Sequence, residues 1–353
     1  MILKVVKSLL IVSLVIFSGC GRDGPLLVDE PIEKLSQALD DVVPTLMDKN
    51  DVVGLSIVII RANEVAVSRS FGYADLESKK QINEDTVYKA ASLGKPVFGY
   101  IVAYLAQQGK IDLDKPLYSY TREEVVRNDP RSRIVTARMV LSHTTGLPNL
   151  GEQTELKFYF EPGNGFKYSG HGYLYLQSAI ERITGKSLNE LAREIVFKPL
   201  SMTASSYVWR NDYENVVSSS YGADKDKYDV KREALVGYSA WSLYTTPEDY
   251  SKFITHIMSS SINDGSIASQ LLLPNVDVAR GVKWGLGWGI QDTEPNQSFW
   301  HWGSMAGFRH YVVGYPEEQV AVIVMANSRK SFKMVDSAMV KSIGGSYPSY
   351  DWF

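Results

Sequence analysis

Ser92 and Lys95 are the residues whose types and spacing most directly indicate chemistry. Positions i and i+3 share one face of a helix, so the lysine amine can reach the serine hydroxyl and take its proton. A lysine acts as that base only where burial or nearby positive charge lowers its pKa. The pair therefore predicts a serine nucleophile that forms an acyl-enzyme, provided that the fold buries Lys95.

The residues after Ser92 predict a buried helix. Residues 93–108 are apolar on nearly every face and precede Gly109, a residue typical of the position after a helix C-terminus. Pro96 is tolerated in a first turn, so we expect Ser92 at the helix N-terminus, where the helix dipole favours developing negative charge. A capping serine beside a solvated lysine would give the same spacing, so the rest of the chain must decide between the two interpretations.

Two later segments combine aromatic residues with glycine. The first, residues 166–174, contains Tyr168 and Gly170, and the second, residues 300–308, contains His301, Trp302, Gly303 and Ser304. Residues 141–148 lie between Ser92 and the first segment, and residues 240–249 lie between the two segments. In this order the motifs resemble the serine β-lactamase and penicillin-binding family, its class C branch in particular. That branch also contains D-alanyl-D-alanine carboxypeptidases, D-amino-acid amidases and carboxylesterases. The resemblance runs from about residue 72 to residue 326.

The resemblance implies a role for each matching residue. It makes Ser92 the nucleophile, Lys95 its proton partner and Tyr168 a general base or proton shuttle. The ammonium of Lys95 would depress the pKa of Tyr168 toward the working range. The backbone N–H groups of Ser92 and Ser304 would form the oxyanion hole, where each donor typically accounts for about 3 kcal/mol of the barrier.

Three positions depart from the family pattern and bear on the substrate. Gly170 stands where the family usually has an asparagine that binds an amide carbonyl of the substrate. On the strand that edges the site, which also contains Gly303, His301 replaces a lysine and Trp302 replaces a threonine that helps to hold a substrate carboxylate. Losing one such contact commonly lowers the rate roughly tenfold to a hundredfold. We therefore expect a small-molecule ester or amide substrate in preference to a β-lactam.

Two other functions are kept as alternatives. The first is a β-lactamase or D-alanyl-D-alanine carboxypeptidase acting on a peptide-like substrate. The second is a non-catalytic binding lipoprotein that retains the fold, against which the intact Ser92, Lys95 and Tyr168 argue. His143 is interpreted as an ordinary packed residue beneath the site.

Composition and motifs argue against other chemistries. The sequence has one cysteine, five histidines and no His-Glu-x-x-His, so neither a metal nor any other cofactor is expected. A Gly-x-Ser-x-Gly elbow is also absent. The net charge of −3 and the lack of a basic block give no indication of nucleic-acid binding.

The N-terminus indicates export. Lys4 and Lys7 precede an apolar run at 9–17 that is too short to span a bilayer but typical of a signal peptide. Residues 17–20 resemble a bacterial lipobox, so residues 1–19 are expected to be a lipoprotein signal peptide and Cys20 to be lipidated. A plain signal peptide or an uncleaved anchor is the alternative. Because Gly21 and not aspartate follows the cysteine, we expect a periplasm-facing protein held at the outer membrane by its N-terminal lipid.

Periodicity predicts the elements that must position these residues. After a tether at 20–30, one α/β domain is expected over residues 31–353: an antiparallel sheet flanked by helices, of the β-lactamase and transpeptidase type. A mostly helical lobe is inserted at about 96–237. The predicted helices are 31–47 and 332–343, and the predicted strands are 54–60, 64–71, 284–291, 309–314 and 319–325. The glycine-rich stretch 285–289 is interpreted as the entry to a strand.

Overall fold

The computed structural model describes residues 25–152, 156–228, 235–293 and 296–352. The expected signal peptide, Cys20 and the first part of the expected tether lie outside these residues. Residues 25–30 of the tether contact the domain, where the Leu27 N–H donates a hydrogen bond of 2.8 Å to the Ile343 carbonyl. Within the described ranges, no helix has both the length and the apolar character needed to cross a membrane.

An antiparallel sheet forms the centre of the molecule. Its nine strands, as far as the chain is described, follow the order β3-β2-β1-β13-β12-β11-β10-β9-β8. Their bounds are β1 Gly54–Arg61, β2 Glu64–Asp75, β3 Lys80–Gln81, β8 Val276–Ala279, β9 Val282–Trp284, β10 Gly289–Thr293, β11 Asn296–Met305, β12 Phe308–Tyr315 and β13 Val320–Ala326. Strands from the two ends of the chain therefore pair side by side, with β1 against β13.

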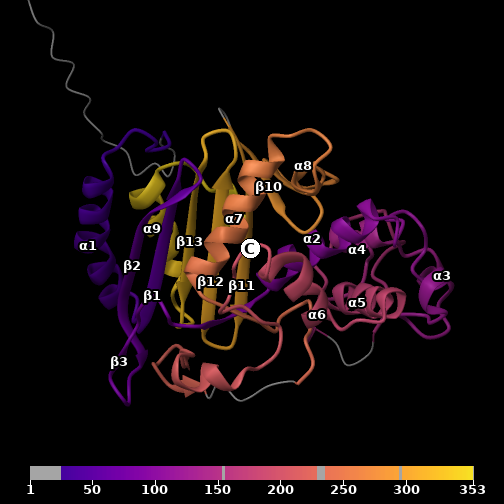
Figure 1. Ribbon diagram of the computed structural model, residues 1–353, viewed down its shortest axis with the longest axis horizontal. Coiled ribbons are helices and arrows are strands. Elements are labelled where there is room, and N and C mark those ends of the chain that lie inside the picture. The colour runs from indigo at the N-terminus through magenta and orange to yellow at the C-terminus, as the bar shows by residue number, and fades with distance from the viewer. Residues whose placement is uncertain (1–24, 153–155, 229–234, 294–295, 353) are drawn as a thin grey trace, which may run out of the picture.

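Helices cover both faces of the sheet (Figure 1). The N-terminal helix α1 (Ile32–Lys49) packs with α9 (Phe332–Ile343) on one face, and α7 (Pro247–Ser261) crosses the other. Side chains of β13 alternate between these two layers: Val322 and Val324 join the core under α1 and α9, while Ile323 joins the core under α7. This period-2 pattern is the one that a strand buried on both faces requires.

The inserted lobe lies beside the sheet and contains mostly short helices (Figure 1). Its elements are β4 Tyr88–Ala91, α2 Gly94–Gln107, α3 Tyr118–Thr121, η1 Pro130–Arg133, α4 Ala137–Leu141, α5 Gly170–Thr184, α6 Leu188–Ala192, η2 Arg193–Phe197, η3 Asn211–Asn215, β5 Ser220–Tyr221 and β6 Lys227–Tyr228. It is followed by β7 Leu243–Thr245, α7, α8 Ile267–Leu272 and finally, after the sheet, α10 Pro348–Trp352. The lobe contacts the sheet through β4, which approaches β11, β12 and β13.

Most predicted elements are confirmed, and one is wrong. The predicted helix 332–343 has the bounds of α9, and the other predicted helix and strands overlap α1, β1, β2, β12 and β13. The single strand predicted at 284–291 is instead two strands joined by a turn. Gly287 has a φ of 89°, and the N–H groups of Leu286 and Gly287 bond to carbonyls of Leu271 and Leu141. These glycines therefore turn the chain toward α8 and α4 instead of extending a strand.

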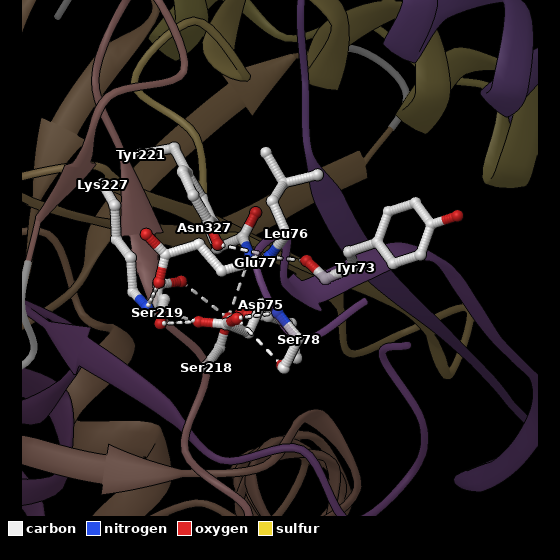
Figure 2. A network of polar contacts seen from close by, with 11 residues as sticks. Tyr73, Asp75, Leu76, Glu77, Ser78, Ser218, Ser219, Tyr221, Lys227 and Asn327 are labelled. Carbon is white, nitrogen blue, oxygen red and sulfur yellow. Dashed lines mark hydrogen bonds and ion pairs between the residues drawn. The ribbon is translucent and has the colours of Figure 1, made fainter. Parts of the chain in front are cut away.

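A polar network fastens the segment 218–228 to the sheet (Figure 2). The Lys227 ammonium lies 2.7 Å from a carboxylate oxygen of Asp75 and 2.9 Å from one of Glu77. The Tyr221 N–H donates to the Asn327 carbonyl at 2.8 Å. Tyr221 backbone atoms in turn lie 2.3 Å from the place that a Cβ on Gly307 would occupy. The network thus holds this segment against the turn between β11 and β12.

Candidate active site

Ser92 lies in the turn between β4 and α2, which begins at Gly94. The preceding residue, Ala91, has a φ of 52°, a left-handed conformation that costs a non-glycine residue on the order of 1 kcal/mol. The turn is held by surrounding side chains, because Tyr250 donates to the Leu93 carbonyl at 3.0 Å. The helix starts one residue later than the pattern predicted, and Ser92 remains beside its N-terminus.

Lys95 is buried beside Ser92, as a lysine base requires. Its Nζ lies 3.0 Å from Ser92 Oγ and donates to the Ala240 carbonyl at 2.7 Å. The side chain is only 2% exposed, and this burial lowers the pKa of Lys95 from 10.5 to about 7. A substantial fraction of the amine is therefore neutral near neutral pH and able to accept the Ser92 proton.

Tyr168 stands beside this pair, but its expected pKa shift is wrong. The Lys95 Nζ lies over the Tyr168 ring, 4.8 Å from its centroid. The Tyr168 hydroxyl is buried and makes no hydrogen bond of good geometry to the described residues. Burial raises its pKa, and the nearby Ser92 lowers it by a smaller amount, so the pKa of Tyr168 lies above its usual value. Tyr168 is thus a neutral proton donor at neutral pH, and Lys95 is the group suited to act as base.

His143 is buried beneath the site, as expected, and packs directly against Tyr168. The two ring centroids are 4.3 Å apart, and His143 Nδ1 accepts a hydrogen bond of 3.0 Å from the Ser169 N–H. Burial and the charge of Lys95 lower the pKa of His143 well below its usual value, so the ring is neutral. The only signal in the sequence was its place among the ordered motifs. His143 therefore binds the backbone at Ser169 and packs against the Tyr168 ring.

His301 is a neutral residue buried beside Tyr168. It is fully buried, and burial together with the Lys95 charge lowers the pKa of His301 to about 3. Its Nδ1 donates to the Trp302 carbonyl at 2.7 Å, since a carbonyl can only accept. Nε2 is then an acceptor, buried and without a partner among the described residues. His301 consequently supplies no positive charge to bind a substrate carboxylate.

Trp302 forms part of an aromatic cluster behind Tyr168. Its ring lies 4.7 Å from the Tyr168 ring and 5.9 Å from that of Trp352 in α10. Trp284 and Trp300 complete the cluster, at centroid distances of 6.1 Å and 5.6 Å from Trp302. Helix α10 thereby supports the aromatic cluster that packs against Tyr168.

Gly303 allows the two halves of the site to meet. A Cβ at this position would stand 2.4 Å from the Ala90 carbonyl oxygen, so β11 can pass β4 this closely only with glycine. The close approach places Ser304, the residue after Gly303, at the same pocket as Ser92. This is the juxtaposition that the expected oxyanion hole requires.

The pocket above Ser92 has a volume of about 350 Å³. It is lined by Ser92, Lys95, Asn149, Leu150, Ala240, Trp241, Ser304 and Met305. Of the expected substrate-binding residues, Gly170, His301, Trp302 and Gly303 are not in this lining, and Asn149 was not predicted. A larger hollow of about 600 Å³ lies beside α6 and η2 but contains no paired nucleophile and base. Among the described residues, no cluster of His, Cys, Asp and Glu has the arrangement of a metal site.

A family model and several curated proteins match most of this chain. The family model described as Beta-lactamase matches residues 39–341. Protein flp of Staphylococcus aureus (strain MRSA252) is 21% identical over 319 residues, which cover 84% of this chain and 64% of the relative. The chain thus spans less than two thirds of the length of these curated relatives.

Solved structures show the same fold. A crystal structure of a class C beta lactamase has a TM-score of 0.77 at 18% identity, covering 88% of this chain and 98% of the other. The octameric penicillin-binding protein homologue from Pyrococcus abyssi has a TM-score of 0.73 at 20% identity, covering 86% and 76%. Because the family model spans most of the residues that form the sheet, the lobe and the pocket, the chain belongs to the Beta-lactamase family.

Proposed function

We propose that this protein is a serine hydrolase that acts on an ester or amide through an acyl-enzyme on Ser92. The observation that carries the proposal is the contact of 3.0 Å between Ser92 Oγ and a buried lysine whose pKa is about 7. An activated nucleophile needs a base within hydrogen-bond reach and with a pKa near the working pH. This arrangement also argues against a non-catalytic binding protein, because a buried lysine is costly to keep without a use.

In the proposed reaction the acyl group passes first to Ser92 and then to water. Neutral Lys95 takes the Ser92 proton as Oγ bonds to the carbonyl carbon, and the carbonyl π electrons move to its oxygen. The N–H groups of Ser92 and Ser304 stabilise that oxyanion. When the tetrahedral intermediate collapses, the Tyr168 hydroxyl protonates the leaving group and is reprotonated by the Lys95 ammonium. Water then attacks the acyl-enzyme in the reverse sense, which releases the acid and restores Ser92.

The neutral state of His301 removes one expected contact with a substrate carboxylate. A β-lactam or a peptide C-terminus presents a carboxylate, and His301 is neutral where the class C branch usually has a lysine. The indole of Trp302 is packed against Tyr168 and Trp352, where it offers no hydroxyl to a carboxylate. The second candidate function, a β-lactamase or D-alanyl-D-alanine carboxypeptidase, is therefore placed below an esterase or amidase.

Steady-state kinetics on two substrate classes test the proposal. We expect kcat/KM for a short-chain p-nitrophenyl ester to exceed that for a chromogenic cephalosporin by at least ~100-fold, equivalent to about 2.7 kcal/mol. Ser92→Ala should abolish both activities, and Ser259→Ala, on α7 and outside the pocket lining, should retain them. Equal hydrolysis of the two substrates would favour the lactamase, and ester turnover that survives in Ser92→Ala would refute the proposed nucleophile.

We also propose that the protein is a lipoprotein anchored through Cys20 and facing the periplasm. The support is the charged, apolar and cysteine-terminated pattern of residues 1–20. Several acyl chains give stable attachment, so the wild-type protein should stay with membranes through a salt wash and Cys20→Ser should not. Mature wild-type protein found free in the soluble fraction would contradict the anchor.

A further inference from the structure

The hollow of about 600 Å³ beside α6 and η2 is separate from the Ser92 pocket and shares no lining residue with it. No aspartate or glutamate is among the described residues that line this hollow, whereas Arg193, Lys198 and Arg210 are. Arg210 donates a hydrogen bond of 3.0 Å to Asp212 Oδ1, so its charge is balanced. The side chains of Arg193 and Lys198 are exposed and form no ion pair or hydrogen bond with any described residue. The lining therefore carries two cations whose charge no described carboxylate balances.

The local backbone brings these two cations together. η2 is a π-helical turn, in which the Lys198 N–H donates to the Arg193 carbonyl at 2.9 Å. Side chains five residues apart on an α-helix point about 140° away from each other, because each residue turns by about 100°. The wider π turn reduces that angle, and such turns are rare in proteins but frequent at functional sites. Arg193 and Lys198 consequently line the same hollow.

Asn189, in α6, adds hydrogen-bond donors to the lining. Its Oδ1 accepts hydrogen bonds of 2.8 Å from the Tyr207 N–H and 3.1 Å from Ser206 Oγ. A backbone N–H can only donate, so the amide oxygen faces these two groups and the Nδ2 amino group faces away from them. Nδ2 makes no hydrogen bond to a described residue. A lining with free N–H donors and no described carboxylate suits an anion.

An apolar surface adjoins these donors. Phe197 stacks on Tyr207 with ring centroids 6.1 Å apart and planes inclined by 27°, and Met202 and Val208 line the hollow with Phe197. Phe197 and Met202 are buried, so the core packing of the lobe fixes this surface. The volume lies within the range typical of small-molecule sites, which combine apolar surface with a few polar groups. The hollow thus suits a small molecule that has one anionic and one apolar part.

We propose that this hollow binds a phosphate monoester of an apolar alcohol, a function separate from hydrolysis at Ser92. Such a phosphate carries about 1.5 to 2 negative charges at neutral pH, which matches Arg193 and Lys198 together, whereas a carboxylate carries one. The Arg193 guanidinium can donate two parallel hydrogen bonds to phosphate oxygens, and the Lys198 ammonium adds a point charge. The Asn189 amino group donates to a further oxygen, and the carbon skeleton of the alcohol lies against Phe197.

Isothermal titration calorimetry with phenyl phosphate, on the full chain near neutral pH and at fixed low salt, tests the charged part of this site. We expect Arg193→Gln and Lys198→Gln each to raise Kd roughly tenfold to a hundredfold, because a hydrogen bond between charged groups is lost. Both side chains are exposed, so Tm of the unliganded protein should not change. The matched controls Arg127→Gln and Lys110→Gln remove exposed cations outside the hollow and should leave Kd unaltered.

Inorganic phosphate tests the apolar part, since it has a similar charge and no phenyl group. It should bind the wild-type protein at least ~10-fold more weakly than phenyl phosphate, and Val208→Asn, with a polar side chain of similar size, should reduce that difference. Ser92→Ala should bind phenyl phosphate as the wild type does, because Ser92 lies in the other pocket.

Four results would overturn the proposal. They are no binding of phenyl phosphate to the wild-type protein, unaltered binding in a variant that combines Arg193→Gln with Lys198→Gln, equal affinity for phenyl phosphate and inorganic phosphate, and loss of binding in Ser92→Ala. None of these measurements requires ester turnover, so the hydrolase and this site can fail independently.

Discussion

The acylation rate should depend on pH through Lys95. Burial lowers the pKa of Lys95 from 10.5 to about 7, because the charged ammonium loses its hydration and no carboxylate of the described residues lies beside it to compensate. The active form is the neutral amine. The rate should therefore rise about tenfold for each pH unit below roughly pH 7, with about 1% of the maximal rate near pH 5, and level off above about pH 8.

Neighbouring groups should not obscure this titration. Burial lowers the pKa of His301 to about 3 and lowers that of His143 well below its usual value, so both rings stay neutral over this range. Burial raises the pKa of Tyr168, which keeps its hydroxyl protonated. The low-pH limb of the profile thus reports on Lys95.

The assay is the second-order rate constant for labelling Ser92 with an alkyl fluorophosphonate from about pH 5 to pH 9. Lys95→Arg keeps a positive charge that cannot be removed in this range, and Lys95→Met removes the amine with similar volume. Both variants should label at least ~10³-fold more slowly than wild type at pH 8 and without the limb near pH 7. A wild-type profile that keeps rising toward pH 10, or an unchanged limb in Lys95→Met, would refute Lys95 as the base.

Three other predictions follow from single contacts. Gly303→Ala should lower kcat for the p-nitrophenyl ester at least tenfold, because its Cβ pushes β11 away from β4; normal kcat would contradict the close approach. His143→Leu should lower kcat more than it changes KM, because Tyr168 loses its orientation; unaltered kinetics would remove His143 from this role. Burial raises the pKa of Asp75, but hydrogen bonds from Lys227, Ser78 and Ser219 outweigh it and hold that pKa well below 3.8. This carboxylate therefore stabilises the fold fully above about pH 4, and the stabilisation declines as pH falls from there toward the lowered pKa. Asp75→Asn should accordingly lower Tm in thermal unfolding by less at pH 3 than at pH 7, and equal losses at both pH values would contradict the ion pair.

The sequence predicts the chemistry of the site better than its surroundings. Ser92, Lys95 and Tyr168, which the structure brings together, could be selected as candidates because their spacing and order are local features of the chain. The strands β1, β12 and β13 could also be predicted, because side chains buried on both faces give runs rich in apolar residues.

What could not be predicted depends on contacts between distant segments. The pKa of Tyr168 follows from burial, which outweighs the nearby Lys95. Asn149 and His143 lie in or beside a loop whose contacts with Gly170 and Tyr168 exist only after folding. Likewise, the turn at Gly287 depends on carbonyls of α4 and α8, which no periodicity within 284–291 could reveal.

The proposed acyl-enzyme can be tested most directly by acid-quenching the protein during ester turnover and mapping the adduct by peptide mass spectrometry. We predict one acyl group, on the peptide that contains Ser92, absent from Ser92→Ala and accumulating far more slowly in Lys95→Met. An acyl group on a different serine, or ester turnover with no covalent intermediate on Ser92, would contradict it.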